Sequence, residues 1–218
     1  MASAADMIDK LHWLGHSSFR LDGPVTIYFD PWKLPRGSKR ADIILVSHEH
    51  FDHFSKDDIA AISGKDTVIV ANAQVAGELG PVKASCREIK TLAPGMSCDI
   101  GGVNVKAVPS YNIGKDFHPK ASGKLGFIVN VNGVGIYHAG DTDRIPEMSG
   151  LRCDIALLPV SGTYVMTAGD AAAAAADIKP RIAVPMHYAD IAGSARDAES
   201  FAKLLSGKVE VRILKKEK

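Results

Sequence analysis

Short apolar runs of four to seven residues, bounded by Gly, Pro, Asp or Asn, recur along the whole chain. Runs of this length with such boundaries are typical of β-strands, and they outnumber stretches with helical periodicity. The pattern predicts eleven strands, over residues 11–14, 18–21, 25–30, 43–47, 67–71, 103–109, 126–131, 135–138, 155–160, 182–186 and 209–214.

Three helices are predicted between these strands, over residues 55–62, 169–178 and 194–205. Ser55 and Ser194 each precede an acidic residue three positions further on, which is the spacing of a capping box. The first third of the chain is rich in strands, and helices alternate with strands later. We therefore expect stacked sheets covered on the outside by helices.

Length, charge and composition limit the possible functions. The chain has 218 residues and a formal net charge of +1, so we expect one domain over residues 1–218 and no generic nucleic-acid binding. The longest apolar runs have about six residues, whereas a membrane span needs roughly 20, and the start of the chain lacks the pattern of a signal peptide. A cytoplasmic protein with no membrane association is expected. The three cysteines argue against a disulfide framework.

A histidine-rich segment follows the predicted strand 43–47. Within six residues it contains His48, His50, Asp52 and His53. In an extended segment His48 and His50 point the same way, so both imidazoles can reach one metal ion. Asp52 and His53 are adjacent, so the chain must turn there to present both to a second position. The sequence therefore predicts a two-metal site at the carboxyl end of this strand.

Polar residues also follow other predicted strands. His138 and Asp141 come at the end of the run 135–138, and His187 directly follows the run 182–186. Tyr164 comes shortly after another strand, behind a Ser-Gly turn. Because several strand ends carry residues capable of metal binding or hydrogen bonding, we expect them to converge on one site.

The His48-x-His50-x-Asp52-His53 segment, the Gly-Asp-Thr at 140–142 and the Pro-Met-His at 185–187 resemble the ligand motifs of the metallo-β-lactamase-fold hydrolases. The resemblance covers nearly the whole chain. Its opening Leu-Gly-His-Ser-Ser-Phe at 14–19 is similar to a branch of small metal-dependent hydrolases, related more distantly to ascorbate-6-phosphate lactonases and to the phospholipase D acting on N-acyl phosphatidylethanolamines. The resemblance implies an α+β fold, a four-layer αββα sandwich with the site at one edge.

The resemblance also implies a set of ligands for two divalent metal ions. The first ion would be held by His48, His50 and a third histidine, and the second by Asp52, His53 and His187, with Asp141 bridging both. For the third histidine we favour His118, which lies in a loop without regular periodicity, over His138. The Gly-His-Thr-x-Gly sequence that many family members show there is absent from this chain.

These ligands are nitrogen and oxygen donors, which suit Zn²⁺ best and also accommodate Mn²⁺ or Fe²⁺. We expect Asp30 either to orient a metal-binding histidine or simply to form a turn with the proline after it. His16 either lines the pocket or has a structural role.

The expected reaction is hydrolysis of an ester-type bond by a hydroxide activated between two metal ions. Asp52 would bind metal and orient the hydroxide, and the leaving group would take its proton from Asp52, Tyr164 or a metal-bound water. By resemblance the substrate is a small-molecule phosphoester or lactone. Two divalent ions would leave the site locally positive, so an anionic substrate is expected. Self-association into a homo-oligomer is left open.

Two other functions compete with this hypothesis. His50, Asp52 and His187, with Arg196 nine residues later, imitate the metal-binding triad and the oxoacid-binding arginine of a mononuclear iron oxygenase. That interpretation leaves His48, His53 and Asp141 unexplained. The second alternative is a non-catalytic metal-binding protein on the same fold, which the complete set of ligands makes the weaker hypothesis.

Overall fold

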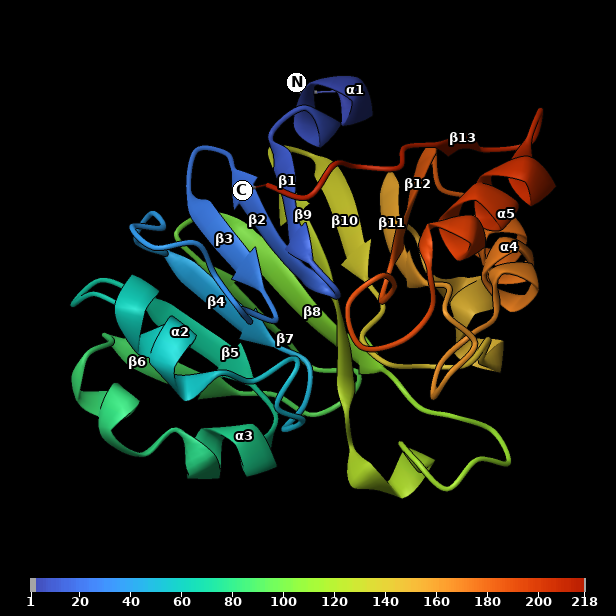
Figure 1. Ribbon diagram of the computed structural model, residues 1–218. Helices are drawn as coiled ribbons and strands as arrows, with labels where there is room; N and C mark the ends of the chain where they lie inside the picture. The colour runs from blue at the N-terminus through green and yellow to red at the C-terminus, as the bar shows by residue number, and fades with distance from the viewer. Residues whose placement is uncertain (1–2, 218) are drawn as a thin grey trace.

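Two β-sheets face one another and helices cover their outer faces (Figure 1). The computed structural model describes residues 3–217. Stacked sheets covered by helices are what the sequence pattern predicts, and the structure adds that the strands up to Thr91 form one sheet and those from Ser97 onwards form the other. This is the αββα sandwich, and in the described part of the chain no helix is long and apolar enough to cross a bilayer.

The first sheet contains six strands in chain order, β1 to β6. β1, β2 and β3 are antiparallel neighbours, whereas β3 to β6 run parallel to one another. Their bounds are β1 Leu11–Gly15, β2 Ser18–Asp22, β3 Thr26–Phe29, β4 Ile43–Val46, β5 Val68–Ala71 and β6 Glu88–Thr91.

The second sheet contains seven strands, in the order β13-β12-β11-β10-β9-β8-β7. β7 to β10 are antiparallel neighbours and β10 to β13 are parallel. Their bounds are β7 Ser97–Ile100, β8 Val103–Pro109, β9 Leu125–Val131, β10 Val134–His138, β11 Ile155–Pro159, β12 Ile182–Met186 and β13 Glu210–Val211.

The helices divide between the two outer faces. α2 and α3 lie against the first sheet and α4 and α5 against the second (Figure 1). The α-helices are α1 Ala4–Ile8, α2 Lys56–Ile62, α3 Ala73–Glu78, α4 Ala168–Ile178 and α5 Ala195–Leu205, and the 3₁₀ helices are η1 Gly80–Ala84, η2 Lys120–Ser122 and η3 Pro146–Gly150. The predicted helix starts are correct, because the side chain of Ser55 caps α2 and Ser194 forms a capping box on α5.

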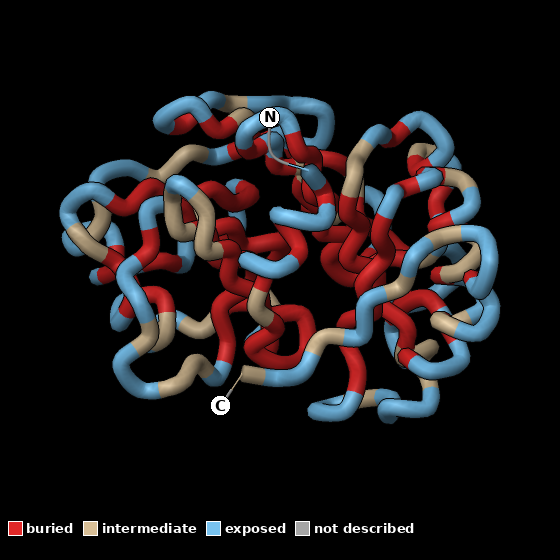
Figure 2. Tube along the Cα trace, turned by 90° about the horizontal axis from the view of Figure 1, so that it is seen from above, coloured by how far each residue is buried: buried red, intermediate tan, exposed pale blue. Residues whose placement is uncertain are grey.

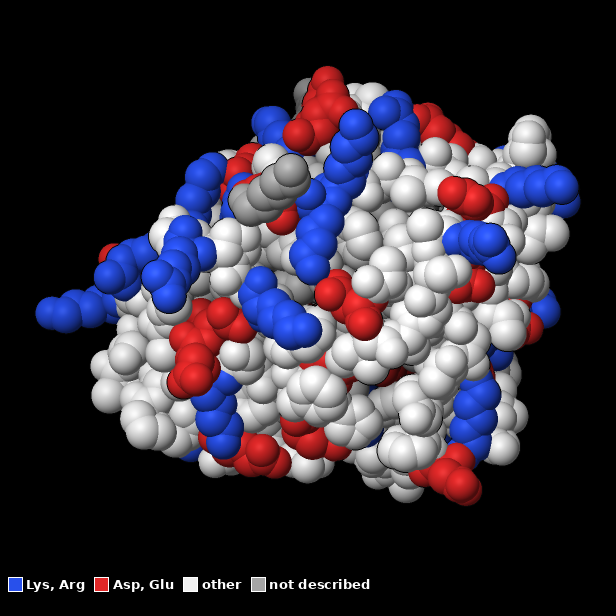
Figure 3. Space-filling view, in the orientation of Figure 1, with Lys and Arg blue, Asp and Glu red and all other residues white. Residues whose placement is uncertain are grey.

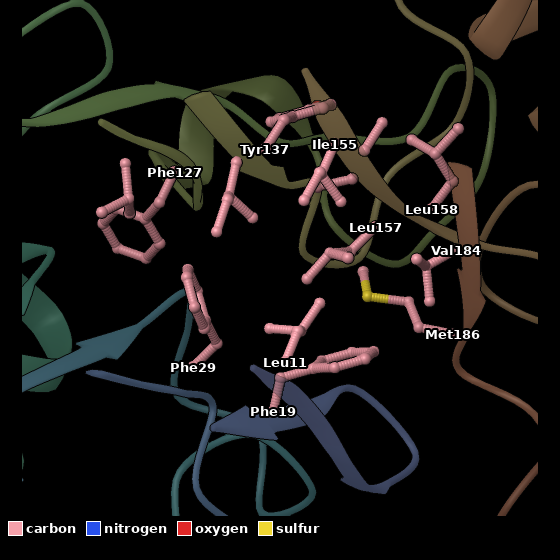
Figure 4. Packing of buried hydrophobic residues seen from close by; sticks show 14 of the residues in the cluster. Leu11, Phe19, Phe29, Phe127, Tyr137, Ile155, Leu157, Leu158, Val184 and Met186 are labelled. Atoms are coloured by element: carbon pink, nitrogen blue, oxygen red, sulfur yellow. The ribbon is translucent and has the colours of Figure 1, made fainter. Parts of the chain in front are cut away.

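The main core lies between the sheets, where large apolar side chains from both meet (Figure 4). Phe19 and Phe29 from the first sheet face Phe127 and Leu157 from the second, and all four are fully buried. Buried segments occupy the middle of the molecule and exposed segments its periphery (Figure 2). This burial of apolar surface is the main force that holds the sheets together.

The sequence pattern misses several peripheral elements. Asn72 caps the short helix α3 by accepting a hydrogen bond from the N–H of Val75 at 2.9 Å. β6 and β7 are half-exposed edge strands with too few apolar residues to stand out. The strand predicted over residues 209–214 is too long, because only Glu210–Val211 pairs with β12.

The pairing directions bring the ends of seven strands to one edge of the sandwich. β1, β3 and β4 run the same way in the first sheet, and β8, β10, β11 and β12 do so in the second. The loops that follow these strands carry almost all the polar residues singled out by the sequence. Convergence of strand ends is thus a consequence of topology.

Candidate metal centre

The histidine-rich segment leaves β4 and turns directly into α2. The N–H groups of His53 and Phe54 both donate to the carbonyl of His50 at 2.9 Å. This tight turn presents His48 and His50 on one side and Asp52 and His53 on the other. The local conformation that the residue spacing predicts is therefore present.

A first group of potential ligands consists of His48, His50, His118 and Asp141, whose ligand atoms lie within 4.8 Å of one another. Nδ1 of His50 is 3.2 Å from Nε2 of His48 and 3.1 Å from Nε2 of His118. His118 comes from the long loop between β8 and β9. The structure thus brings the favoured third histidine to this group.

A second group consists of His16, Asp52, His53 and His187, whose ligand atoms also lie within 4.8 Å of one another. Nε2 of His16 lies 3.0 Å from Oδ2 of Asp52. The rings of His16 and His187 are 4.0 Å apart between their centroids. His16 follows β1 and His187 follows β12, so this group joins the two sheets.

Asp141 lies between the two groups. Its Oδ1 is 3.2 Å from Nε2 of His53, and its Oδ2 is 3.3 Å from Nε2 of His187 and 3.6 Å from Nε2 of His118. One carboxylate therefore approaches histidines of both groups, which is the arrangement expected of a bridging ligand.

Burial keeps the first group of histidines neutral. It lowers the pKa of His48 well below its ordinary value and lowers the pKa of His118 to about 4. The pKa of His50 is also lowered, by burial and then by the charge of Lys124. Neutral imidazoles have a free nitrogen lone pair, which is the form that binds a metal ion.

The charges of His53 and Asp141 support each other. Burial alone lowers the pKa of His53, but the carboxylates of Asp141 and Asp30 outweigh it and hold that pKa well above the ordinary value. Burial raises the pKa of Asp141, yet His187 and His53 together hold it well below its ordinary value. Positive charge is therefore favoured at this place, where a divalent cation would also be attracted.

Three buried polar atoms of the two ligand groups lack a hydrogen-bond partner within residues 3–217. One is Nδ1 of His16, and the other two are Nε2 of His53 and Oδ1 of Asp141, which approach each other at 3.2 Å without the geometry of a hydrogen bond. Leaving such atoms unpaired is costly, so they indicate a missing partner. A metal ion coordinated by His53 and Asp141 would satisfy these last two atoms, and the nitrogen and oxygen donors around them fit zinc, manganese or iron.

Hydrogen bonds from neighbouring residues orient the histidines. Oδ2 of Asp30 accepts hydrogen bonds from Nδ1 of His53 at 2.7 Å and from Oγ of Ser47 at 2.6 Å. Nδ1 of His48 in turn donates to Oγ of Ser47 at 2.8 Å. In both histidines Nε2 is thereby directed at the centre. Asp30 fulfils both expectations, because it also turns the chain with a φ of 43°.

Left-handed backbone conformations concentrate at this centre. Nine non-glycine residues between 3 and 217 have a positive φ, and five of them belong to the centre or its pocket. These five are His16, Asp30, His118, Tyr164 and His187. A side chain in this conformation costs about 1–2 kcal/mol, so the surrounding contacts must hold these residues in place. Such concentrated strain is typical of functional sites.

A pocket of about 330 Å³ opens onto both groups of ligands. Its inner wall contains five of the candidate ligands, His50, Asp52, His118, Asp141 and His187. Tyr164 lines the mouth, where it is exposed, and its carbonyl accepts a hydrogen bond from Nδ2 of Asn112 at 2.6 Å. The proposed catalytic residues Asp52 and Tyr164 thus face the same space.

His138 and Arg196 do not contribute to either group. His138 is buried in β10, where its Nε2 donates to the carbonyl of Ser17 at 2.8 Å and its ring stacks on Phe29. Arg196 is exposed on α5. His50 and Asp52 fall into different groups, so the triad needed for a mononuclear iron oxygenase is not assembled.

Comparison with known proteins identifies the family. The sequence matches the Beta-lactamase superfamily domain over residues 10–187. The chain belongs to this superfamily. A UPF0173 metal-dependent hydrolase from Pyrococcus horikoshii is 34% identical, with 94% of this chain and 96% of the relative covered.

Two solved structures of similar proteins have the same architecture. A protein from Parabacteroides distasonis, proposed to be a metal-dependent hydrolase, is 34% identical with a TM-score of 0.83, covering 94% of this chain and 93% of the other. Igni18, a metallo hydrolase from Ignicoccus hospitalis, has a TM-score of 0.78 at 22% identity, with 95% of each chain covered. The metallo-β-lactamase fold expected from the sequence is confirmed.

The sequence leaves two features of the centre undetermined that the structure makes plain. His16 belongs to the second group, although its position after Gly15 in a turn is equally typical of a structural residue. Ser161, after β11, places its Oγ 3.0 Å from Nδ1 of His187. Both contacts join segments far apart in the sequence, so local spacing carries no signal for them.

Proposed function

We propose that this protein is a hydrolase that uses two divalent metal ions to cleave an ester-type bond of a small molecule, either a phosphoester or a lactone. The observation that carries the proposal is the pair of histidine and aspartate groups, linked by Asp141 and open to one pocket. His48, His50 and His118 would hold one ion, and Asp52, His53 and His187 the other, with Asp141 between them. His16 is a further ligand or a partner of Asp52. Zinc is the proposed metal.

In this mechanism the oxygen of a water molecule bonds to the carbonyl carbon or phosphorus, the bond to the leaving oxygen breaks, and that oxygen takes up a proton. Two divalent cations, when bound, supply a positive field that favours water ionisation and stabilises the developing negative charge. Asp52 orients the attacking water and accepts its proton, held in place by His16. The proton reaches the leaving group from Asp52 or from Tyr164, which both line the pocket.

Metal content and activity test the proposal together. The purified protein should contain about two metal ions per chain, and it should hydrolyse members of a panel of p-nitrophenyl phosphodiesters, simple esters and lactones. Asp52→Asn should lower kcat by about 10²-fold or more, since general base catalysis contributes this much. Asp66→Asn, on an exposed turn, is the matched control and should retain full activity. Two bound metals with no activity on the panel would favour a non-catalytic protein.

A second variant locates the proton donor. Tyr164→Phe keeps the aromatic ring and removes only the hydroxyl group. If Tyr164 protonates the leaving group, kcat should fall by about 10²-fold while KM changes little. The loss should be smallest for p-nitrophenolate, a leaving group that needs little protonation. An equal loss for all leaving groups would show that Tyr164 is not the proton donor.

A further inference from the structure

Four large apolar side chains surround the mouth of the pocket. They are Phe51, Phe117, Tyr164 and Ile191, and together we call them the apolar collar. Their exposed fractions are 69%, 52%, 47% and 45%. Isolated exposed apolar residues are common, but several at the rim of one pocket mark a binding surface.

Three of the four collar residues lie on loops that also carry candidate ligands. Phe51 lies between His50 and Asp52, Phe117 directly precedes His118, and Ile191 follows His187 in the loop after β12. Tyr164 lies in the loop after β11, which approaches the centre through Ser161 and His187. The collar therefore lies beside the candidate ligands, so that a molecule at the centre also contacts it.

Contacts among the aromatic rings hold the collar in an open arrangement. The rings of Phe117 and Tyr164 meet edge to face, with centroids 4.8 Å apart. Phe51 makes a similar contact with Trp32 at 6.2 Å. These contacts brace the rings while about half or more of each collar ring remains exposed, so the apolar surface is preformed for a ligand.

Fixed positive charge is lacking around this pocket. Within residues 3–217, its lining includes no lysine or arginine. Lys124 approaches His50 at 3.2 Å, but it is buried and donates to Glu49 at 2.8 Å. Over the face shown in Figure 3 basic and acidic side chains are interspersed. Negative charge on the substrate can thus be balanced only at the metal centre.

We propose that the collar binds an apolar acyl or aromatic group of the substrate, next to the bond that is cleaved. This inference rests on the proposed hydrolytic function and makes its substrate class more specific. Any negative charge belongs to the group at the metal ions, and the remainder of the molecule is apolar. A pocket of about 330 Å³ is at the small end of ligand sites, which suits one short chain or one ring.

Ester series of increasing chain length test the collar by activity. For p-nitrophenyl acetate, butyrate and hexanoate, kcat/KM should rise by up to about fourfold for each added methylene group that the collar buries. The monosuccinate ester, which places a carboxylate at the collar, should be a poorer substrate than the butyrate. Ile191→Ser and Phe51→Ser should flatten the chain-length dependence. Ile213→Ser is the matched control, because Ile213 is 44% exposed outside the pocket, and it should leave the dependence unchanged.

Binding gives a second readout that needs no turnover. Calorimetric titration of the metal-loaded protein with acetohydroxamic and hexanohydroxamic acid should show tighter binding of the longer compound, again by up to about fourfold for each methylene group that the collar buries. A chain-length dependence in binding, without hydrolysis of any phosphodiester, ester or lactone of the panel, would overturn the proposed function and still support an apolar binding site at the collar. If hydrolysis and binding are both independent of chain length, the proposed binding role of the collar is wrong, whereas the proposed hydrolytic function is unaffected.

A measurement of the oligomeric state tests whether a second copy of the chain, instead of a substrate, occupies the collar. Sedimentation of the wild type and of the Ile191→Ser and Phe51→Ser variants should give the same mass for all three. If instead both variants dissociate a dimer and the chain-length dependence is absent, the collar is an interface between copies and the proposal is wrong.

Discussion

The N–H of His187 donates a hydrogen bond to the carbonyl of His16 at 2.9 Å, across the gap between the two sheets. The same carbonyl accepts a second hydrogen bond from Nε1 of Trp13, also at 2.9 Å. Trp13 in turn stacks on Tyr188, with ring centroids 4.8 Å apart. One indole ring thus helps to fix the backbone at His16 and at His187, which belong to two of the three loops that form the second ligand group.

Trp13→Phe tests this arrangement. The change removes the donor to His16 and part of a buried ring, so the free energy of unfolding of the chelated protein should fall by about 1–3 kcal/mol. Metal affinity of the second group should fall with it. Urea unfolding and metal titration measure the two effects. Trp32→Phe is the control, since Trp32 is equally buried and its ring also contacts that of His16, edge to face at 5.5 Å, whereas within residues 3–217 only Trp13 donates a side-chain hydrogen bond to the His16 carbonyl. Equal losses in both variants would contradict a special role for the Trp13 bond.

Asp30→Asn should weaken metal binding more than it weakens the fold. Asp30 accepts hydrogen bonds from His53 and from both the N–H and Oγ of Ser47. An amide in its place presents a donor to one of them, and His53 loses its orientation. Loss of such a partner typically lowers metal affinity by about 10–100-fold. Competition with a chelator measures the affinity of each site.

Asp42→Asn provides the control for Asp30. Asp42 also accepts a backbone N–H, from Thr26 at 2.7 Å, but it lies before β4, at the end of the sheet away from the centre. Its variant should keep both metal affinities. If the Asp30→Asn variant binds two metal ions as tightly as the wild type, Asp30 only forms the turn in the chain and does not orient His53 for metal binding.

The parts of the site that the sequence predicts are those with a local signal. His48, His50, Asp52 and His53 share one segment, and its spacing alone indicates two facing groups. Asp141 and His187 follow strands whose direction fixes where they end. His16 has no such signal, because its place depends on an antiparallel hairpin and on a hydrogen bond to a loop about 170 residues away. The collar likewise cannot be predicted from the sequence, because the exposure of its side chains depends on how the loops fold.

Gly140→Ala should be strongly destabilising. Gly140 has a φ of +63°, and a Cβ there would meet the carbonyl oxygen of Leu125 at 2.8 Å and Oγ of Ser110 at 3.0 Å. The positive φ and the clash with backbone should together lower the free energy of unfolding by about 2–4 kcal/mol. Because Asp141 is the next residue, metal binding should fall as well.

Gly133→Ala separates strain from the clash. Gly133 also has a positive φ, of +85°, but a Cβ there would meet nothing within 4 Å. Its variant should lose only about 1 kcal/mol, through backbone strain, and should bind metal normally. Thermal unfolding of both variants without metal gives the comparison, and similar losses would show that the close approach at Gly140 is relieved by small shifts.

Asp22 links stability to pH far from the metal centre. Burial raises its pKa, but hydrogen bonds from Lys39 and Arg20 outweigh burial and hold the pKa below the ordinary value of 3.8. Arg20 also binds Glu217 through two hydrogen bonds, at 2.9 and 3.0 Å, so Asp22 belongs to a network that holds the end of the chain on the first sheet. A carboxylate with a lowered pKa stabilises the fold above pH 3.8, and this stabilisation disappears as pH falls through the folded-state pKa.

Asp22→Asn should therefore lower the free energy of unfolding by about 1–2 kcal/mol at neutral pH. The difference from the wild type should shrink as the pH falls below about 4, because the unfolded chain takes up a proton at Asp22 before the folded protein does. Urea unfolding of the chelated protein at each pH measures this difference and keeps metal release out of the comparison. Asp66→Asn, on an exposed turn, should show no such pH dependence. A difference that persists unchanged to pH 3 would mean that Asp22 acts through hydrogen bonding that its amide also provides, and not through its charge.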